Sequence, residues 1–163
     1  VITGTVAAND RDPDAGATLT FALAAPVPGL ILDSDGSFRF DPSNAAYQDI
    51  AQGAVRNVVA NYTVTDDRGA SSTGTLTIAV TGVNDAPVAV ADGFSMNENT
   101  VLNGNVRSND SDIDGPAPIF SILRNVANGT LTLDPATGDF VYTPRRNFFG
   151  TETFEYILSD GLA

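Results

Sequence analysis

Two loops of this chain carry an acidic side chain at every second residue, a spacing that suits a hard cation. Both read Asn-Asp-x-Asp-x-Asp, with carboxylates at Asp10, Asp12 and Asp14 and again at Asp110, Asp112 and Asp114. On an extended strand these carboxylates would repel one another, and burying them would cost free energy. In a loop, alternate oxygens can converge on one ion, and Ca²⁺ takes about six to eight oxygen ligands. The pattern therefore predicts a calcium site in each loop.

Further oxygen ligands stand where a Greek-key sandwich would bring them to the same end. Asn84 and Asp85 lie in residues 82–87, between two β-rich halves, and Asp160 follows an aromatic strand. The predicted site of the second half comprises Asn84, Asp85, Asp110, Asp112, Asp114 and Asp160. The matching set in the first half is Asp10, Asp12, Asp14, Asp66 and Asp67.

Other readings of the acidic residues must be weighed against calcium. Asp and Asn are ordinary turn residues, so a single acidic loop is more often a solvated turn. Recurrence of the triplet in both halves favours calcium, whereas residues 33–36 read as a plain hairpin turn. An EF-hand is rejected, because Ser121 stands where the twelfth-position acid is required. Glu98 is either a ligand for a further junction or a surface charge.

Composition excludes several kinds of chemistry. The chain has no Cys, His or Trp, and its eight basic residues are all Arg. Thiolate and imidazole metal sites, histidine general bases and Schiff-base lysines are therefore absent. Asp66 and Asp67 could in principle act as a glycosidase pair, but no acid stands in an evident apolar pocket, so we predict that the chain is not an enzyme. The net charge of −12 disfavours nucleic acid and anionic membranes as partners, and the short apolar runs predict no membrane insertion.

The two halves are copies of one unit. Asp33-Ser-Asp-Gly36-Ser-Phe38 in the first matches Asp134-Pro-Ala-Thr-Gly138-Asp-Phe140 in the second, and Tyr62-Thr-Val-Thr-Asp66 matches Tyr156-Ile-Leu-Ser-Asp160. The repeat predicts two domains, residues 1–86 and 87–163.

Short stretches of alternating apolar and polar residues, separated by turn residues, predict a β-sandwich in each copy. The expected strands are 2–8, 18–24, 29–33, 37–41, 57–65 and 73–81, then 88–95, 100–107, 118–124, 130–134, 139–143 and 151–158. Residues 44–53 alone have helical spacing. The first copy lacks a counterpart of strand 88–95, and the second lacks a counterpart of strand 73–81. Each copy is therefore expected to have an open sheet edge, and neighbouring sequence would supply the missing strand.

The strand pattern also predicts the core. The inward positions of the first copy are Val6, Leu19, Phe21, Leu30, Phe38, Phe40, Tyr62, Val64, Leu76 and Ile78. Those of the second are Val106, Phe120, Ile122, Leu131, Leu133, Phe140, Tyr142, Phe154, Tyr156 and Leu158.

These motifs resemble known families. Gly82-Val-Asn84-Asp85-Ala-Pro87 resembles the cadherin linker, although Ala86 replaces its second Asn, and Asp110-x-Asp112 resembles the cadherin Asp-x-Asp loop. Asp160 resembles the Asp after the aromatic strand. The first copy, with Asp35-Gly-Ser-Phe-x-Phe-Asp41-Pro42, resembles a VCBS repeat, and the second resembles the bacterial cadherin-like tandem repeats. The resemblance implies an all-β chain of two cadherin-like, Ig-like Greek-key sandwiches joined by a calcium-binding linker.

What the resemblance implies for function is a non-catalytic, calcium-stabilised extender or adhesion module of a large repetitive bacterial adhesin of the RTX or biofilm type. Such proteins are extracellular or surface-bound, often exported by type I secretion, and the partners would be neighbouring repeats. The alternative is calcium-dependent polysaccharide binding, for which Arg145-Arg146-Asn147-Phe148-Phe149 is the best patch. The competing reading of that patch is that both rings cap the core and the arginines flank it.

Overall fold

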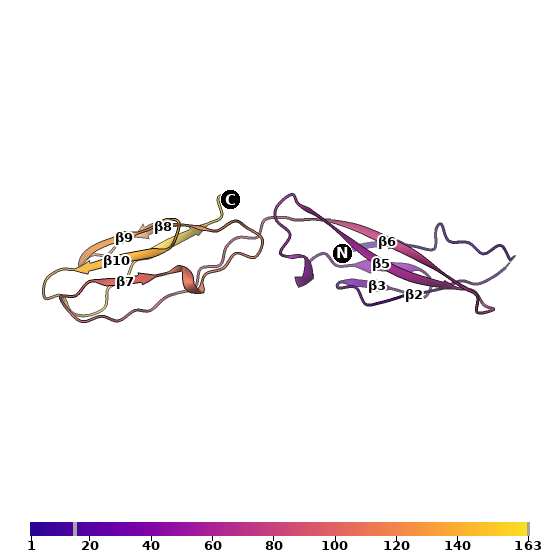
Figure 1. Cartoon of the computed structure of the whole chain (residues 1–163), viewed down its shortest axis with the longest axis horizontal. Coiled ribbons are helices and arrows are strands. Elements are labelled where there is room, and N and C mark those ends of the chain that lie inside the picture. The colour runs from indigo at the N-terminus through magenta and orange to yellow at the C-terminus, as the bar shows by residue number, and fades with distance from the viewer. Residues whose placement is uncertain (15, 163) are drawn as a thin grey trace. The chain divides into compact units, whose positions relative to one another are not determined.

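The chain divides into two β-rich units, Val1–Val83 and Asn84–Ala163 (Figure 1). The computed structural model describes residues 1–14 and 16–162. All paired strands are antiparallel, and the described helical elements are two short 3₁₀ turns, η1 (Ala45–Tyr47) and η2 (Arg107–Asn109). The predicted all-β class is confirmed. No helix among the described residues is long and apolar enough to cross a membrane.

Unit 1 contains two three-stranded sheets. One has the order β1-β4-β3, from Ile2–Thr5, Ser37–Phe40 and Leu30–Leu32. The other has the order β2-β5-β6, from Thr20–Leu23, Val55–Thr65 and Ser71–Thr81. β5 and β6 form a long hairpin, paired from Val55↔Thr81 to Thr65↔Ser71 (Figure 1). Alternating burial along both strands places Val58, Ala60, Ile78 and Val80 in the core, as period-two patterning requires.

Unit 2 repeats this plan with fewer paired strands. One sheet has the order β7-β10-β9, from Leu102–Asn105, Asp139–Pro144 and Gly129–Leu133. The other contains two strands, β8 (Ile119–Arg124) and β11 (Glu155–Ser159). The pairing Phe120↔Leu158 reproduces Phe21↔Val64 of the first unit, so β8 and β11 correspond to β2 and β5.

Three local expectations from the sequence are wrong. Residues 88–95 form no regular strand; their one ladder contact is the bridge Val88↔Ser111. The last strand begins at Glu155 rather than 151, and no strand of the described residues pairs with its outer edge. The helical stretch 44–53 shrinks to η1, whose first turn is capped by the Asn44 side chain accepting from Ala46 N at 3.1 Å. The other predicted strands are present, with ends shifted by a few residues.

The predicted core is confirmed. Every residue expected to point inward lies in one of three apolar clusters, two in unit 1 and one in unit 2, and Phe40, Phe120 and Val106 are the largest fully buried side chains. Tyr47 and Ile50, from the segment after β4, join the first cluster without having been predicted. Tyr47 donates its hydroxyl to Pro28 O at 2.6 Å, which satisfies the one polar group that it buries.

Candidate metal centre

The acidic loop of unit 2 is shaped by its own carboxylates. It follows β7 and η2, and Asp112 Oδ1 accepts from Gly115 N at 3.0 Å and from Asp114 N at 3.4 Å. A Cβ atom at position 115 would lie 2.3 Å from Asp112 Oδ2, so any side chain there would have to displace this carboxylate. The turn therefore holds Asp112 and Asp114 next to each other.

Residues from distant parts of unit 2 meet at this loop. Asp85 N donates to Asp114 Oδ1 at 3.2 Å, and Asn84 Nδ2 donates to Asp160 Oδ2 at 2.6 Å. Asp160 Oδ1 in turn accepts from Leu162 N at 2.8 Å, which fixes the carboxylate just after β11. Of the six residues predicted for this site, Asn84 and Asp160 are joined through their side chains, and Asp85 is joined to Asp114 through its main-chain N–H.

Three oxygens at this place are buried and have no hydrogen-bond partner: Asn84 Oδ1, Asp112 Oδ2 and Asp114 Oδ2. Asp114 and Asp160 are also the buried charged residues of the described chain, at 9% and 6% exposure. No ion pair of the described residues involves Asp112 or Asp114. Buried charges are stable when they are paired or coordinate a metal, so this arrangement calls for a cation.

The donor set consists of carboxylate and amide oxygens, which are the ligands that Ca²⁺ prefers. Within residues 1–14 and 16–162, however, no three His, Cys, Asp or Glu side chains converge closely enough to hold a metal by themselves. An ion here would need the Asn84 amide oxygen as well as the carboxylates, with main-chain or water oxygens completing its shell. With such a coordination shell, these residues fit calcium.

Asp110 has hydrogen-bond partners outside this group. Its Oδ1 accepts from Val90 N at 2.7 Å, and its Oδ2 accepts from Tyr156 Oη at 3.0 Å. The same Tyr156 hydroxyl lies 3.2 Å from Asp92 Oδ2. Burial raises the pKa of Asp92, and the neighbouring Asp110 charge raises it further, while the Tyr156 hydrogen bond opposes both. Sequence reasoning missed Asp92, because it stands in no acidic run.

In unit 1, the three carboxylates of the acidic loop each have a different partner. Asp10 Oδ2 accepts from Tyr62 Oη at 3.0 Å, which repeats the Asp110–Tyr156 contact of unit 2. Asp12 Oδ1 accepts from Asp14 N at 2.7 Å, and Asp14 forms an ion pair with Arg68.

The two later acids of unit 1 lie in the β5–β6 turn. Asp66 Oδ1 caps it by accepting from Arg68 N at 2.9 Å and Ala70 N at 2.8 Å. Asp67 is exposed on the same turn. Among the described residues of this unit, no buried side-chain oxygen lacks a partner.

The fold and the paired acidic loops define a tandem of cadherin-like, adhesion-type β-sandwiches. Both units match the model of the bacterial cadherin-like domain, over residues 1–82 and 84–163. The chain therefore belongs to the bacterial cadherin-like family, whose adhesion-type domains are typically non-catalytic. The first copy's resemblance to a VCBS repeat stays a prediction.

Part of the chain is also similar to a curated protein. A protein named calcium-binding lectin RapA2, from Rhizobium johnstonii, is 35% identical over 77 residues, which cover 47% of this chain and 33% of that protein. The chain thus spans about a third of the curated relative that it matches.

Two solved cadherin structures share the fold. Drosophila N-cadherin EC1-4 has a TM-score of 0.52 and 17% identity, covering 87% of this chain and 37% of that one. The human desmocollin-1 ectodomain has a TM-score of 0.53 and 18% identity, covering 90% of this chain and 28% of that one. At these identities the likeness concerns the fold alone, and it confirms the cadherin-like class.

Proposed function

We propose that the chain is a non-catalytic, calcium-stabilised extender module of a large extracellular bacterial adhesin. The observation that carries this proposal is the group of three buried, partnerless oxygens on Asn84, Asp112 and Asp114. The family match and the relative named as a calcium-binding lectin support it. The partners would be neighbouring repeats of the same polypeptide, and export by type I secretion, as in RTX-type adhesins with VCBS repeats, belongs to the same proposal.

Calcium would act on the segment with which unit 2 begins. In the structure, that segment is held to the acidic loop by the Asp85 N–H and to Asp160 by the Asn84 amide. Each buried oxygen without a partner costs about 1–3 kcal/mol. An ion coordinated by all three oxygens would remove this cost and would hold residues 84 and 85 against the rest of unit 2. A ligand that binds only the folded form adds about 2.7 kcal/mol at a hundredfold excess over its Kd.

Calorimetric calcium titration of the full chain tests the metal site. The double variant Asp112→Asn and Asp114→Asn should lose the tightest binding step. Asp139→Asn is the matched control, because Asp139 is an exposed acid of the same unit that hydrogen-bonds Asn105 and Thr137 and lies outside the candidate site. Equal binding by the double variant and the control would refute the site.

Small-angle scattering tests the extender role on the same samples. The radius of gyration of the chain should vary over a narrower range in calcium than in chelator, because the ion would order the segment at residues 84 and 85 that joins the two units. Identical scattering in both buffers, with calcium binding intact, would reject the extender role while leaving the metal site in place.

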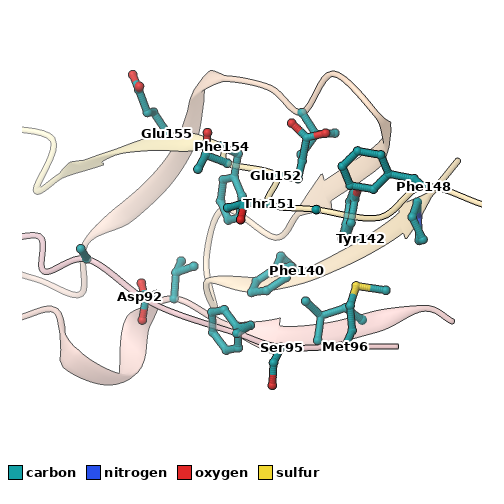
Figure 2. Close-up of a pocket in the computed structure, with 18 of the residues that line it drawn as sticks. Asp92, Ser95, Met96, Phe140, Tyr142, Phe148, Thr151, Glu152, Phe154 and Glu155 are labelled. Carbon is teal, nitrogen blue, oxygen red and sulfur yellow. The ribbon is translucent and has the colours of Figure 1, made fainter. Parts of the chain in front are cut away.

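Polysaccharide binding is the second candidate, and one surface feature favours it. Phe149 is 85% exposed, and Arg145 and Arg146 beside it are exposed and join no ion pair among the described residues. The competing reading, that both rings cap the core, fails for Phe149, whereas Phe148 is half-buried and lines a cavity between residues 89–98 and 148–156 (Figure 2). The loop is held by Asn147 N donating to Asn99 Oδ1 at 2.8 Å.

At this loop an acidic polysaccharide would contact two arginine side chains and one exposed aromatic ring. Pull-down on an immobilised acidic polysaccharide, with and without calcium, tests the idea. Phe149→Ala and Arg145→Ala should abolish retention, and Phe94→Ala, at a ring 46% exposed on another segment, should not. Retention unchanged in the first two variants would exclude this surface.

A further inference from the structure

One end of the three-stranded sheet of unit 2 is hollowed. The hollow lies between residues 99–101, which lead into β7, and the end of β10 with the turn that follows it. Its volume is about 460 Å³, within the range of about 300–1,000 Å³ that small-molecule sites occupy. The pairing Tyr142↔Leu102 joins the two walls through the sheet, and the hollow shares no residue with the candidate metal centre.

Each wall carries an asparagine in the left-handed backbone conformation. Asn99 has φ 59° and Asn147 has φ 61°, and among the described residues these are the two non-glycine residues with positive φ. Asn147 N donates to Asn99 Oδ1 at 2.8 Å, so a hydrogen bond also joins the two walls. Left-handed backbone costs free energy for any residue except glycine, and such residues cluster at ligand-binding sites. The walls are thus held in a fixed shape without a ligand, which lowers the cost of binding one.

The hollow offers polar groups that no other part of the described protein uses. The side chains of Thr143, Arg146 and Asn147 are exposed and form no hydrogen bond or ion pair within residues 1–14 and 16–162. Val101 and Pro144 add apolar surface to the same lining. A ligand in the hollow would therefore meet a hydroxyl, a guanidinium and an amide beside an apolar surface.

The charge of the hollow favours an anion. Among the described residues, none that lines it is acidic, although the chain as a whole carries a net charge of −12 that repels anions. Glu98, next to Asn99 in the sequence, lines the other cavity, between residues 89–98 and 148–156, and not this hollow. A guanidinium binds a carboxylate through two parallel hydrogen bonds, so Arg146 suits a ligand with one carboxylate.

The equivalent segment of unit 1 is built differently. Pro42 matches Pro144 in the repeat, but the residues after Pro42 enter η1 and bury Tyr47 in the core. Arg56, which holds this segment, already donates to both carboxylate oxygens of Asp49, at 2.8 and 2.9 Å. Its guanidinium is therefore occupied, and unit 1 serves as an internal control for unit 2.

We propose that the hollow binds one carboxylate-bearing sugar unit, a hexuronic acid. The Arg146 guanidinium would hold the sugar carboxylate, and the Asn147 amide and the Thr143 hydroxyl would bind ring hydroxyls. A simple anion would use the guanidinium alone, whereas a hexuronate would use the whole lining. The inference deepens the polysaccharide-binding candidate and rests on it, because the hollow would receive a single acidic unit of the polymer. It needs no metal, since no acidic residue lines the hollow.

Amide NMR spectra of the full chain in chelator, titrated with sodium glucuronate, test the proposal. The amide resonances of residues 99–101 and 145–147 should shift, and those of unit 1 should not. Glucose lacks the carboxylate and sodium acetate lacks the hydroxyls, so each should bind at least about tenfold more weakly than glucuronate.

Substitutions of exposed side chains separate the contributions of the lining. Arg146→Gln should weaken glucuronate binding at least about tenfold, because the bond to the carboxylate is charge-assisted. Thr143→Val and Asn147→Gly should each weaken it roughly two- to tenfold, and glycine keeps the positive φ at position 147. Arg124→Gln is the matched control: it removes the same charge from an exposed residue of β8, which pairs with Glu155 and lies outside the hollow.

The outcomes separate the hollow from the polysaccharide candidate. Shifts confined to the hollow, lost in Arg146→Gln and kept in Arg124→Gln, support the proposal. Equal affinity for acetate and glucuronate overturns it, and so does unchanged binding by Arg146→Gln. Absence of any shift, with the acidic polysaccharide still retained in the pull-down, overturns the hollow alone. Absence of both overturns the hollow together with the polysaccharide candidate.

Discussion

Asparagine substitution of Asp114 should change the stability of unit 2 in opposite directions with and without calcium. Asp114 is 9% exposed, with Oδ1 accepting from Asp85 N and Oδ2 lacking a partner. In chelator, Asp114→Asn removes a buried charge while nearly keeping its size, so unit 2 should become more stable. In calcium, the same change removes a charged ligand, so unit 2 should become less stable.

The structure sets the scale of both effects. Asp114→Asn still buries an unpartnered polar atom but removes its charge, so in chelator each kcal/mol of charge burial that is relieved should raise the melting temperature of a domain of this size by roughly 4–8 °C. In calcium, a tenfold loss of affinity costs about 1.4 kcal/mol, which corresponds to a fall of roughly 6–11 °C.

Differential scanning calorimetry of the full chain in the two buffers measures this reversal. Asp134→Asn is the control, because this exposed turn residue accepts from Ala136 N at 2.8 Å and Thr137 N at 3.0 Å. It should shift the transition of unit 2 equally in both buffers. A shift of the same sign for Asp114→Asn in calcium and in chelator would refute the metal site.

Three further predictions concern the rest of the chain. Arg68→Gln frees Asp14 from its ion pair, so calorimetry should show tighter calcium binding by unit 1; unchanged affinity would mean that the pair does not compete with the ion. Phe120→Ala empties the centre of the second core and should destabilise unit 2 by about 3–5 kcal/mol in denaturant titration, with the unit 1 transition unmoved. Burial and the Asp110 charge raise the pKa of Asp92 above its usual value of 3.8. Ionisation of Asp92 therefore lowers the stability of unit 2 as the pH rises above 3.8 and through the raised pKa. Asp92→Asn in chelator should therefore raise the melting temperature of unit 2 at neutral pH and have no effect well below pH 3.8; a gain that persists there would contradict this cause.

The sequence predicted the part of the fold that depends on the local alternation of apolar and polar residues. Alternating apolar residues predicted β5, β6 and β10, because successive side chains of a strand point to opposite faces whatever the strand pairs with. The same alternation wrongly predicted strands at residues 88–95 and 151–154, which form none. Strand formation there depends on a partner edge, and pairing is a property of residues far apart in the chain.

For the candidate site, the sequence by itself determined which oxygens were available, and the tertiary structure decided what surrounds each one. Asp110, Asp112 and Asp114 look alike in the motif, yet Asp110 accepts from Tyr156 while Asp112 and Asp114 each keep one buried oxygen without a partner. The repeated Asp-Asn pattern is written in consecutive residues, so reading it needs no fold. Whether an oxygen is buried, paired or left for a cation depends on side chains that only folding brings within hydrogen-bonding distance, and that is why the sequence could not rank the three carboxylates.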